Sequence, residues 1–142
     1  MRSIKLFSFF LFFLLLTFQI ASADVTSWEL LGKKKVRKKG HSAVININTQ
    51  DKIFGKIKLS NGHFGIKLFK IDVHFANGEK KRIEIQNYIA KGKESESIDL
   101  PLNSGSISKV VIFFKSKKRT DVSVWGKQHI QQSVNSKKIW TP

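Results

Sequence analysis

Apolar and polar residues alternate along most of the chain beyond residue 24. In segments 43–48 and 53–59 the alternation has a period of two residues, which predicts strands with one buried face. A shorter strand over 28–32 carries Trp28 and Leu30 on one side. In segment 53–59 the pattern sets Ile53 and Gly55 on the face opposite Phe54.

The apolar parity changes once within residues 64–75. One set of positions comprises Phe64, Ile66 and Leu68, and the other comprises Phe69, Ile71, Val73 and Phe75. A slip of a single residue within a continuous apolar run predicts a β-bulge, or a bend between two strands, near Leu68 and Phe69.

Turn residues separate these strands. Asn-Gly pairs are strong short turn signals, so residues 60–62 and 77–78 are predicted turns. The second pair lies between the alternating segments 73–75 and 83–85, which predicts a β-hairpin. Residues 88–93 are predicted to form a loop, and residues 103–106 another turn.

The second half of the chain supplies the remaining strands. A short strand over 98–100 ends at Pro101, because proline cannot donate a ladder hydrogen bond. Segment 107–114 is apolar on both faces, which predicts a central strand covered on both sides. Residues 122–125 form a closing strand, and residues 127–142 a polar C-terminal tail. About eight short strands without an amphipathic helix predict an all-β fold, an antiparallel β-sandwich of jelly-roll type.

The first 23 residues have the pattern of a secretory signal peptide. Arg2 and Lys5 precede an apolar run over 6–20, and small residues follow at 21–23. This run is shorter than the ~20 residues that span a bilayer as a helix, although an uncleaved anchor is the alternative. We therefore expect residues 1–23 to be cleaved and residues 24–126 to form one exported domain, periplasmic or secreted, that is not transmembrane after cleavage.

Charge and cysteine content narrow the chemistry. The chain carries 26 basic and 10 acidic residues. Removal of the leader with its two cations leaves 24 basic residues against 10 acidic ones, a charge of +14. Such a field attracts polyanions, but it also keeps small proteins soluble. The absence of cysteine excludes disulfides, thiolate metal sites and a cysteine nucleophile.

Several short motifs occur in a recognisable order. They are Trp28-Glu29-Leu30-Leu31-Gly32, Phe75-Ala76-Asn77-Gly78, Ser97-Ile98-Asp99-Leu100-Pro101, the apolar spacing of Ile107, Val110 and Ile112, and Val122 with Val124-Trp125-Gly126. Over residues 28–126 the chain resembles a family of small exported bacterial proteins classed as a domain of unknown function. The resemblance implies a jelly-roll-like sandwich, similar in pattern to carbohydrate-binding and discoidin-like modules. It implies no catalytic residues, and this chain is richer in lysine.

Three basic runs are candidate anion-binding sites. Their cations are Lys33, Lys34, Lys35, Arg37, Lys38 and Lys39 in the first run, Lys80, Lys81 and Arg82 in the second, and Lys115, Lys117, Lys118 and Arg119 in the third. Such runs bind phosphate- or sulfate-bearing polymers. They also occur in solvated loops and in edge strands, where lysine discourages edge-to-edge pairing. The binding hypothesis gains if the fold brings two runs together.

Aromatic and histidine residues offer few further sites. Trp125 ends the last strand beside Lys127, where it either stacks on a sugar ring or packs under a loop. Of the four histidines, only His63 and His74 are placed to meet across strands, and two ligands make a poor zinc site. We therefore predict no metal site and no cofactor.

The sequence presents no catalytic motif. The carboxylates are scattered, and the serines lack a nucleophile elbow. We therefore expect a non-catalytic binding module attracted to anionic envelope polymers such as lipopolysaccharide or other polysaccharides, rather than to nucleic acid. The alternative is a structural or protein-interaction module of the envelope, whose protein partner contacts Phe113, Trp125 and Trp140. An unrecognised hydrolase is a third hypothesis and requires a cleft with two facing titratable groups.

Overall fold

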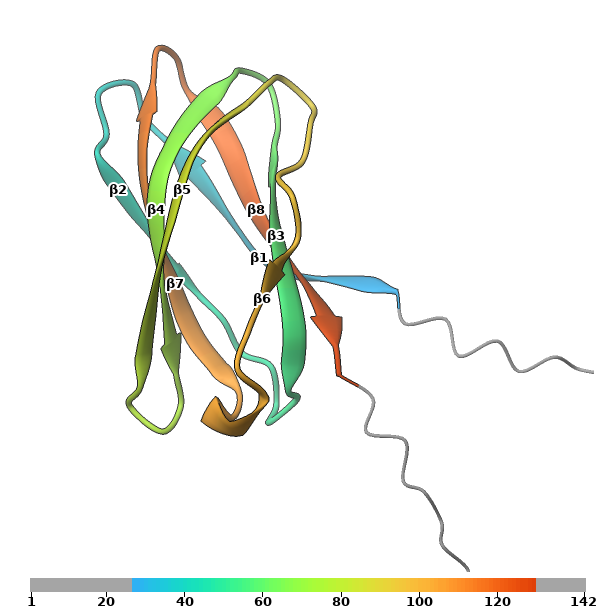
Figure 1. Ribbon diagram of the computed structural model, residues 1–142. Helices are drawn as coiled ribbons and strands as arrows, with labels where there is room; N and C mark the ends of the chain where they lie inside the picture. The colour runs from blue at the N-terminus through green and yellow to red at the C-terminus, as the bar shows by residue number, and fades with distance from the viewer. Residues whose placement is uncertain (1–26, 130–142) are drawn as a thin grey trace, which may run out of the picture.

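The computed structural model describes residues 27–129, which form two packed β-sheets (Figure 1). Their strands are β1 (Trp28–Val36), β2 (Ser42–Asn46), β3 (Phe54–Asn61), β4 (Ile66–Phe75), β5 (Lys80–Ile89), β6 (Ile98–Asp99), β7 (Ile107–Ser116) and β8 (Thr120–Gln128). A short 3-10 helix, η2 (Leu102–Ser104), lies between β6 and β7. The predicted all-β sandwich of about eight strands is confirmed.

The strand order follows from a simple folding pattern. The first sheet has the order β1-β8-β3-β6, and the second has the order β2-β7-β4-β5. Strand β1 pairs with β8, β2 with β7, β3 with β6 and β4 with β5, all antiparallel. The chain is therefore one long hairpin whose tip is the β4–β5 turn, rolled so that successive pairs alternate between the sheets. This arrangement is the jelly roll, as the sequence predicts.

The core lies between the inner faces of the two sheets. Its largest fully buried side chains include Phe54, Phe114, Ile57, Leu59, Ile66, Leu68, Ile71 and Ile112. Leu68 and Ile71 both point inward although they lie three residues apart, because the register of β4 shifts between Leu68 and Lys70. The predicted bulge at Leu68 and Phe69 is therefore confirmed, within one continuous strand.

A second bulge interrupts the alternation at the start of β3. The register between β3 and β8 shifts between Phe54 and Lys56, so the alternation breaks at Gly55. Phe54 is therefore buried, while Ile53 is 37% exposed. Ile53 therefore does not share the inner face with Ile57, as strict alternation across the bulge would require.

The two Asn-Gly pairs behave differently. Asn77-Gly78 closes the β4–β5 hairpin as predicted, with Gly78 at a φ of 89° and the Asn77 side chain accepting a hydrogen bond from the Glu79 N–H. Asn61-Gly62 is not a hairpin turn, because β3 and β4 lie in different sheets. Asn61 is instead the buried last residue of β3, only 4% exposed.

The Asn61 side chain joins several segments. Its amide nitrogen donates to the carbonyl oxygens of Phe64 and, at 3.2 Å, of Ile89. Its Oδ1 accepts from Thr120 Oγ1 at 2.8 Å, and the same hydroxyl accepts from the Phe64 N–H. The amide thus holds the β3–β4 crossover against the end of β5 and the start of β8.

Two expectations from the sequence need adjustment. Strand β7 is central in its sheet, as predicted, but Val111 and Phe113 on its outer face are only half-buried because no layer covers them. Strand β8 extends to Gln128, two residues into the expected polar tail.

The expected leader, residues 1–23, and the tail beyond residue 129 lie outside the described residues. No helix within 27–129 is long and apolar enough to cross a membrane.

Asn61→Ala should lower the free energy of unfolding by about 1–3 kcal/mol, because it leaves buried carbonyls and the Thr120 hydroxyl without a partner. Asn46→Ala, at an exposed strand position, is the control and should change stability by less than about 0.5 kcal/mol. Urea denaturation followed by tryptophan fluorescence measures both. Equal effects of the two substitutions would contradict the role of Asn61.

Candidate functional site

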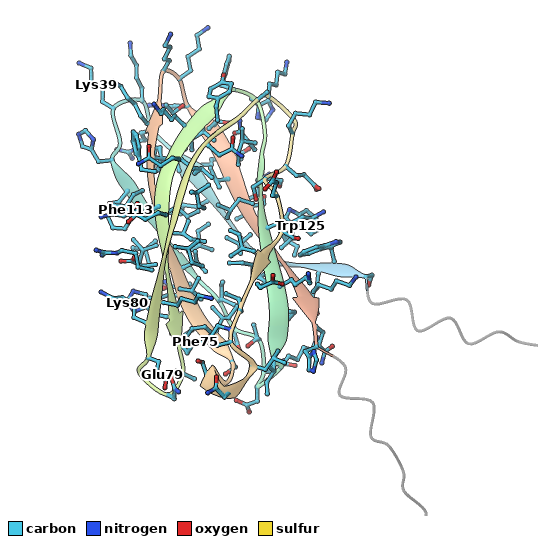
Figure 2. All side chains as sticks on the ribbon, in the orientation of Figure 1. Lys39, Phe75, Glu79, Lys80, Phe113 and Trp125 are labelled. Atoms are coloured by element: carbon cyan, nitrogen blue, oxygen red, sulfur yellow. The ribbon has the colours of Figure 1, made fainter. Side chains whose placement is uncertain are left out.

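Two of the three basic runs meet at one end of the sandwich. The first run begins in β1 and continues into the β1–β2 loop, while the third occupies the end of β7 and the β7–β8 loop. Val36 pairs with Thr120, so the two loops leave the sandwich side by side. Figure 2 shows Lys39 at this end, opposite Glu79 of the β4–β5 hairpin. We call residues 35–39, 63–67, 88, 91–93 and 115–119 the basic end.

The first run divides between an edge strand and a loop. Lys33, Lys34 and Lys35 belong to β1, the outer strand of the first sheet, and all are exposed. Cations at such an edge discourage pairing with another strand. Residues 37–39 lie in the loop beyond, where Lys39 has a φ of 65°. The β1 lysines are therefore placed to prevent pairing of this edge with another strand, whereas the loop cations face solvent.

A first hollow lies between the two basic loops. Its volume is about 480 Å³, and its lining includes Lys35, Arg37, Arg119, His63 and Asp121. Asp121 Oδ2 lies 3.5 Å from Lys33 Nζ and 3.6 Å from His63 Nδ1. This carboxylate thus engages Lys33 at the margin, while neither arginine takes part in an ion pair described within 27–129.

A second hollow lies on the other side of the β3–β4 crossover. It has a volume of about 550 Å³, and Lys67, Lys115, Lys117 and Lys118 line it together with two aromatic residues, Phe64 and Tyr88. Lys118 Nζ lies 4.9 Å from the centroid of the Phe64 ring, within range of a cation–π interaction. The basic end therefore combines cations from several loops with exposed aromatic surface.

The run at 80–82 lies elsewhere. It starts β5 just after the β4–β5 hairpin, and Lys80 projects near the opposite end of the sandwich (Figure 2). Arg82 Nε and Nη2 donate to the two carboxylate oxygens of Asp72 at 2.7 and 2.8 Å. Lys81 Nζ donates to the backbone carbonyl of Asp99. These cations do not join the basic end, so we leave them out of the candidate site.

The two aromatic residues suggested as a partner surface lie on opposite faces (Figure 2). Phe113 is on the outer face of the second sheet, where Lys70 Nζ lies 4.9 Å from its ring centroid. Trp125 is on the outer face of the first sheet, and its indole N–H donates to Ser60 Oγ at 2.8 Å. They cannot form one patch, and Trp140 lies outside the described residues.

The histidines are dispersed. His63 lies in the β3–β4 crossover at the basic end, whereas His74 lies near the hairpin end of β4 and pairs with Lys80 and Lys109. Throughout 27–129, no three His, Asp or Glu side chains are close enough together to hold a metal ion.

Sequence reasoning missed several residues of the basic end. Lys67, Phe64 and Tyr88 were assigned to strands or a loop without a role, and Lys91 and Lys93 were not singled out. The Gly92 N–H donates to the Gly62 carbonyl, which brings the 91–93 segment to the same end. The only sequence signal was an aromatic residue followed closely by two lysines in 88–93.

Arg82→Leu tests whether Arg82 has a structural role. The Asp72 pKa is lowered, mainly by its hydrogen bond to Arg82, so this pair stabilises the fold above about pH 4 and the stabilisation is lost as pH falls through the lowered pKa. The substitution leaves the Asp72 side chain, which is only 7% exposed, without its partner, so it should lower the free energy of unfolding at neutral pH.

The difference in unfolding free energy between the parent protein and Arg82→Leu should narrow as pH falls toward about 3.5, because the carboxyl without its guanidinium partner takes up a proton at a higher pH than the paired one. Urea denaturation at both pH values measures it. Lys34→Leu, an exposed cation on the β1 edge, is the control and should show little pH dependence. A difference that stayed constant with pH would contradict the assignment.

Comparisons with known proteins agree with the fold. No curated protein matches the chain. The solved structure of AlgX from Pseudomonas aeruginosa is similar at a TM-score of 0.50 and 11% identity, covering 72% of this chain and 27% of AlgX. The chain thus spans about a quarter of AlgX, and the likeness shows the fold alone. Residues 8–126 match a family described as a domain of unknown function, DUF2541, and the chain belongs to that family.

Proposed function

We propose that the protein is an exported, non-catalytic module that binds anionic polysaccharide of the cell envelope through its basic end. The observation that carries this proposal is the convergence of two basic runs, distant in sequence, on one end of the sandwich. Loops 37–39 and 117–119 supply six exposed cations there, and Lys91 and Lys93 add two more.

The charge balance at this end favours an anionic ligand. Of the nearby carboxylates, Asp121 faces Lys33 and His63, and Glu94 accepts from Lys58 at 2.6 Å. The loop cations therefore keep a net positive field. Like charges held close together repel one another, and a polyanion that neutralises them also releases its own counterions.

The envelope assignment rests on the leader predicted for residues 1–23. An exported basic module meets lipopolysaccharide and other acidic polysaccharides in the envelope, whereas nucleic acid is chiefly inside the cell. A jelly-roll scaffold suits this role, because its loops gather at the two ends and present side chains from a rigid body.

One observation favours the second candidate, a protein-interaction module. Trp28, Leu30 and Trp125 lie together on the outer face of the first sheet, and Leu30 is 48% exposed. Lys58 Nζ lies 4.6 Å from the Trp28 ring centroid, so the patch is edged by charge. A protein that binds this patch would lose affinity with Leu30→Glu and keep it with substitutions at the basic end.

Heparin, a sulfated polysaccharide, tests the first candidate. If about four cations contact the polymer, its Kd should rise roughly 100-fold between about 50 and 200 mM salt. The double variant Arg37→Gln/Arg119→Gln should reduce the slope of log Kd against log salt by about two. Titration at several salt concentrations measures both quantities.

Lys80→Gln/Lys81→Gln removes the same charge at the other end and is the matched control. It should change the salt dependence much less than the variant at the basic end. Equal losses from the two double variants would reject a localised site, and a Kd that did not vary with salt would reject electrostatic binding altogether.

A further inference from the structure

The hollow beside the β3–β4 crossover has a distinct construction. A row of side chains crosses three strands of the second sheet, because Lys67 of β4 is opposite both Tyr88 of β5 and Lys115 of β7. Lys117 and Lys118 approach from the β7–β8 loop, and all four lysines line the hollow. None of them takes part in the ion pairs found among the described residues.

One part of the Tyr88 ring contacts backbone, and the rest of the ring is exposed. Its side chain is 64% exposed, yet its ring lies against the backbone of Gly65. A Cβ at residue 65 would overlap the phenol oxygen and the ring. Because residue 65 has no side chain, the Tyr88 ring can lie against the backbone there. The rest of the ring faces solvent and the hollow.

Phe64 places one of the cations. It is 41% exposed, and the Lys118 ammonium is 4.9 Å from its ring centroid. The N–H of Phe64 donates to Thr120 Oγ1, which is itself bonded to the buried Asn61 amide. Phe64 is thus fixed by the crossover, and it holds Lys118 beside the hollow rather than leaving it free in solvent.

We infer that this hollow binds a single sugar ring that carries a carboxylate or phosphate group. The C–H face of a pyranose ring is apolar and weakly positive, so it stacks on the negative face of an aromatic ring such as Tyr88. The acidic substituent of the same ring then meets the lysines. This inference rests on the proposed function and names the unit of the polysaccharide that the basic end recognises.

A bare polyanion would not need this arrangement. Lysines alone attract phosphate or sulfate at any position of a chain, and their contribution does not depend on a flat apolar surface. A neutral sugar would gain nothing from the four cations. The hollow, at about 550 Å³, is within the size range of small-ligand sites, and it combines both kinds of contact.

Three small probes distinguish these possibilities by calorimetric titration at low salt. They are a trimer of galacturonate, a neutral galactose trimer and tripolyphosphate, an anion without a ring. Tyr88→Ala should weaken binding of the galacturonate trimer about 10-fold and leave tripolyphosphate binding unchanged. Tyr88→Phe keeps the stacking face and should retain the parental affinity.

Two further variants address the positioning of these groups. Gly65→Ala should mimic Tyr88→Ala, because the added methyl displaces the ring. Phe64→Leu should weaken both anions, because Lys118 loses the ring that holds it. Trp28→Ala removes a half-buried aromatic from the first sheet and is the matched control, with the parental affinity for all three probes. Circular dichroism confirms that each variant is folded.

The outcomes separate this inference from the proposed function. If heparin binding depends on salt as proposed but Tyr88→Ala behaves like Trp28→Ala, the sugar site is rejected and the electrostatic module stands. If Tyr88→Ala weakens tripolyphosphate as much as the galacturonate trimer, ring stacking is rejected. If the galacturonate trimer binds in a Tyr88-dependent way while heparin binding ignores salt and the basic loops, the sugar site stands and the broader proposal falls.

Discussion

The arrangement of the basic end depends on the buried amide of Asn61. The chain leaves the first sheet after β3 and enters the second at β4. The crossover between these strands therefore lies outside both sheets. Buried backbone carbonyls need partners, and the Asn61 side chain bonds those of Phe64 and Ile89 while accepting from Thr120. No buried side-chain nitrogen or oxygen in 27–129 lacks a partner. This satisfied network fixes Phe64, and through it Lys118.

The jelly roll explains why charges that are distant in sequence become neighbours. Rolling a long hairpin places the β1–β2, β3–β4, β5–β6 and β7–β8 connections at one end, and the β4–β5 turn with η2 at the other (Figure 1). Cations in any of the first four connections therefore gather, whatever their separation along the chain. The repulsion among them opposes folding, and burial of the apolar residues between the sheets offsets it. A ligand that neutralises these charges would consequently stabilise the folded state.

Much of the fold could be predicted from residue patterns, because the period-two alternation decides which side chains of a strand share a face. The phase slip at Leu68 and Phe69 located a real bulge, and Asn77-Gly78 located a real hairpin. The alternation of apolar and polar residues does not predict features that depend on which strands pair with each other. Asn61-Gly62 has the same two residue types as the Asn77-Gly78 turn, yet it begins a crossover because β3 pairs with β6 and β8. Phe54 is buried because of a bulge that alternation alone does not reveal.

The candidate site was harder to predict, since it is assembled from segments that alternation cannot place relative to one another. The basic runs were visible as composition, but their separation into an edge strand, a shared end and the Asp72–Arg82 pair required the strand order. The sequence marks Tyr88 only as an aromatic residue shortly before two lysines, because its support comes from Gly65, more than twenty positions away along the chain. A glycine that lies under an aromatic ring of the neighbouring strand becomes informative only when the strand pairing is known. The strand register therefore places these lysines around a hollow beside the Tyr88 ring. On an unfolded chain the same lysines would attract any polyanion, with no preference for one that carries a sugar ring.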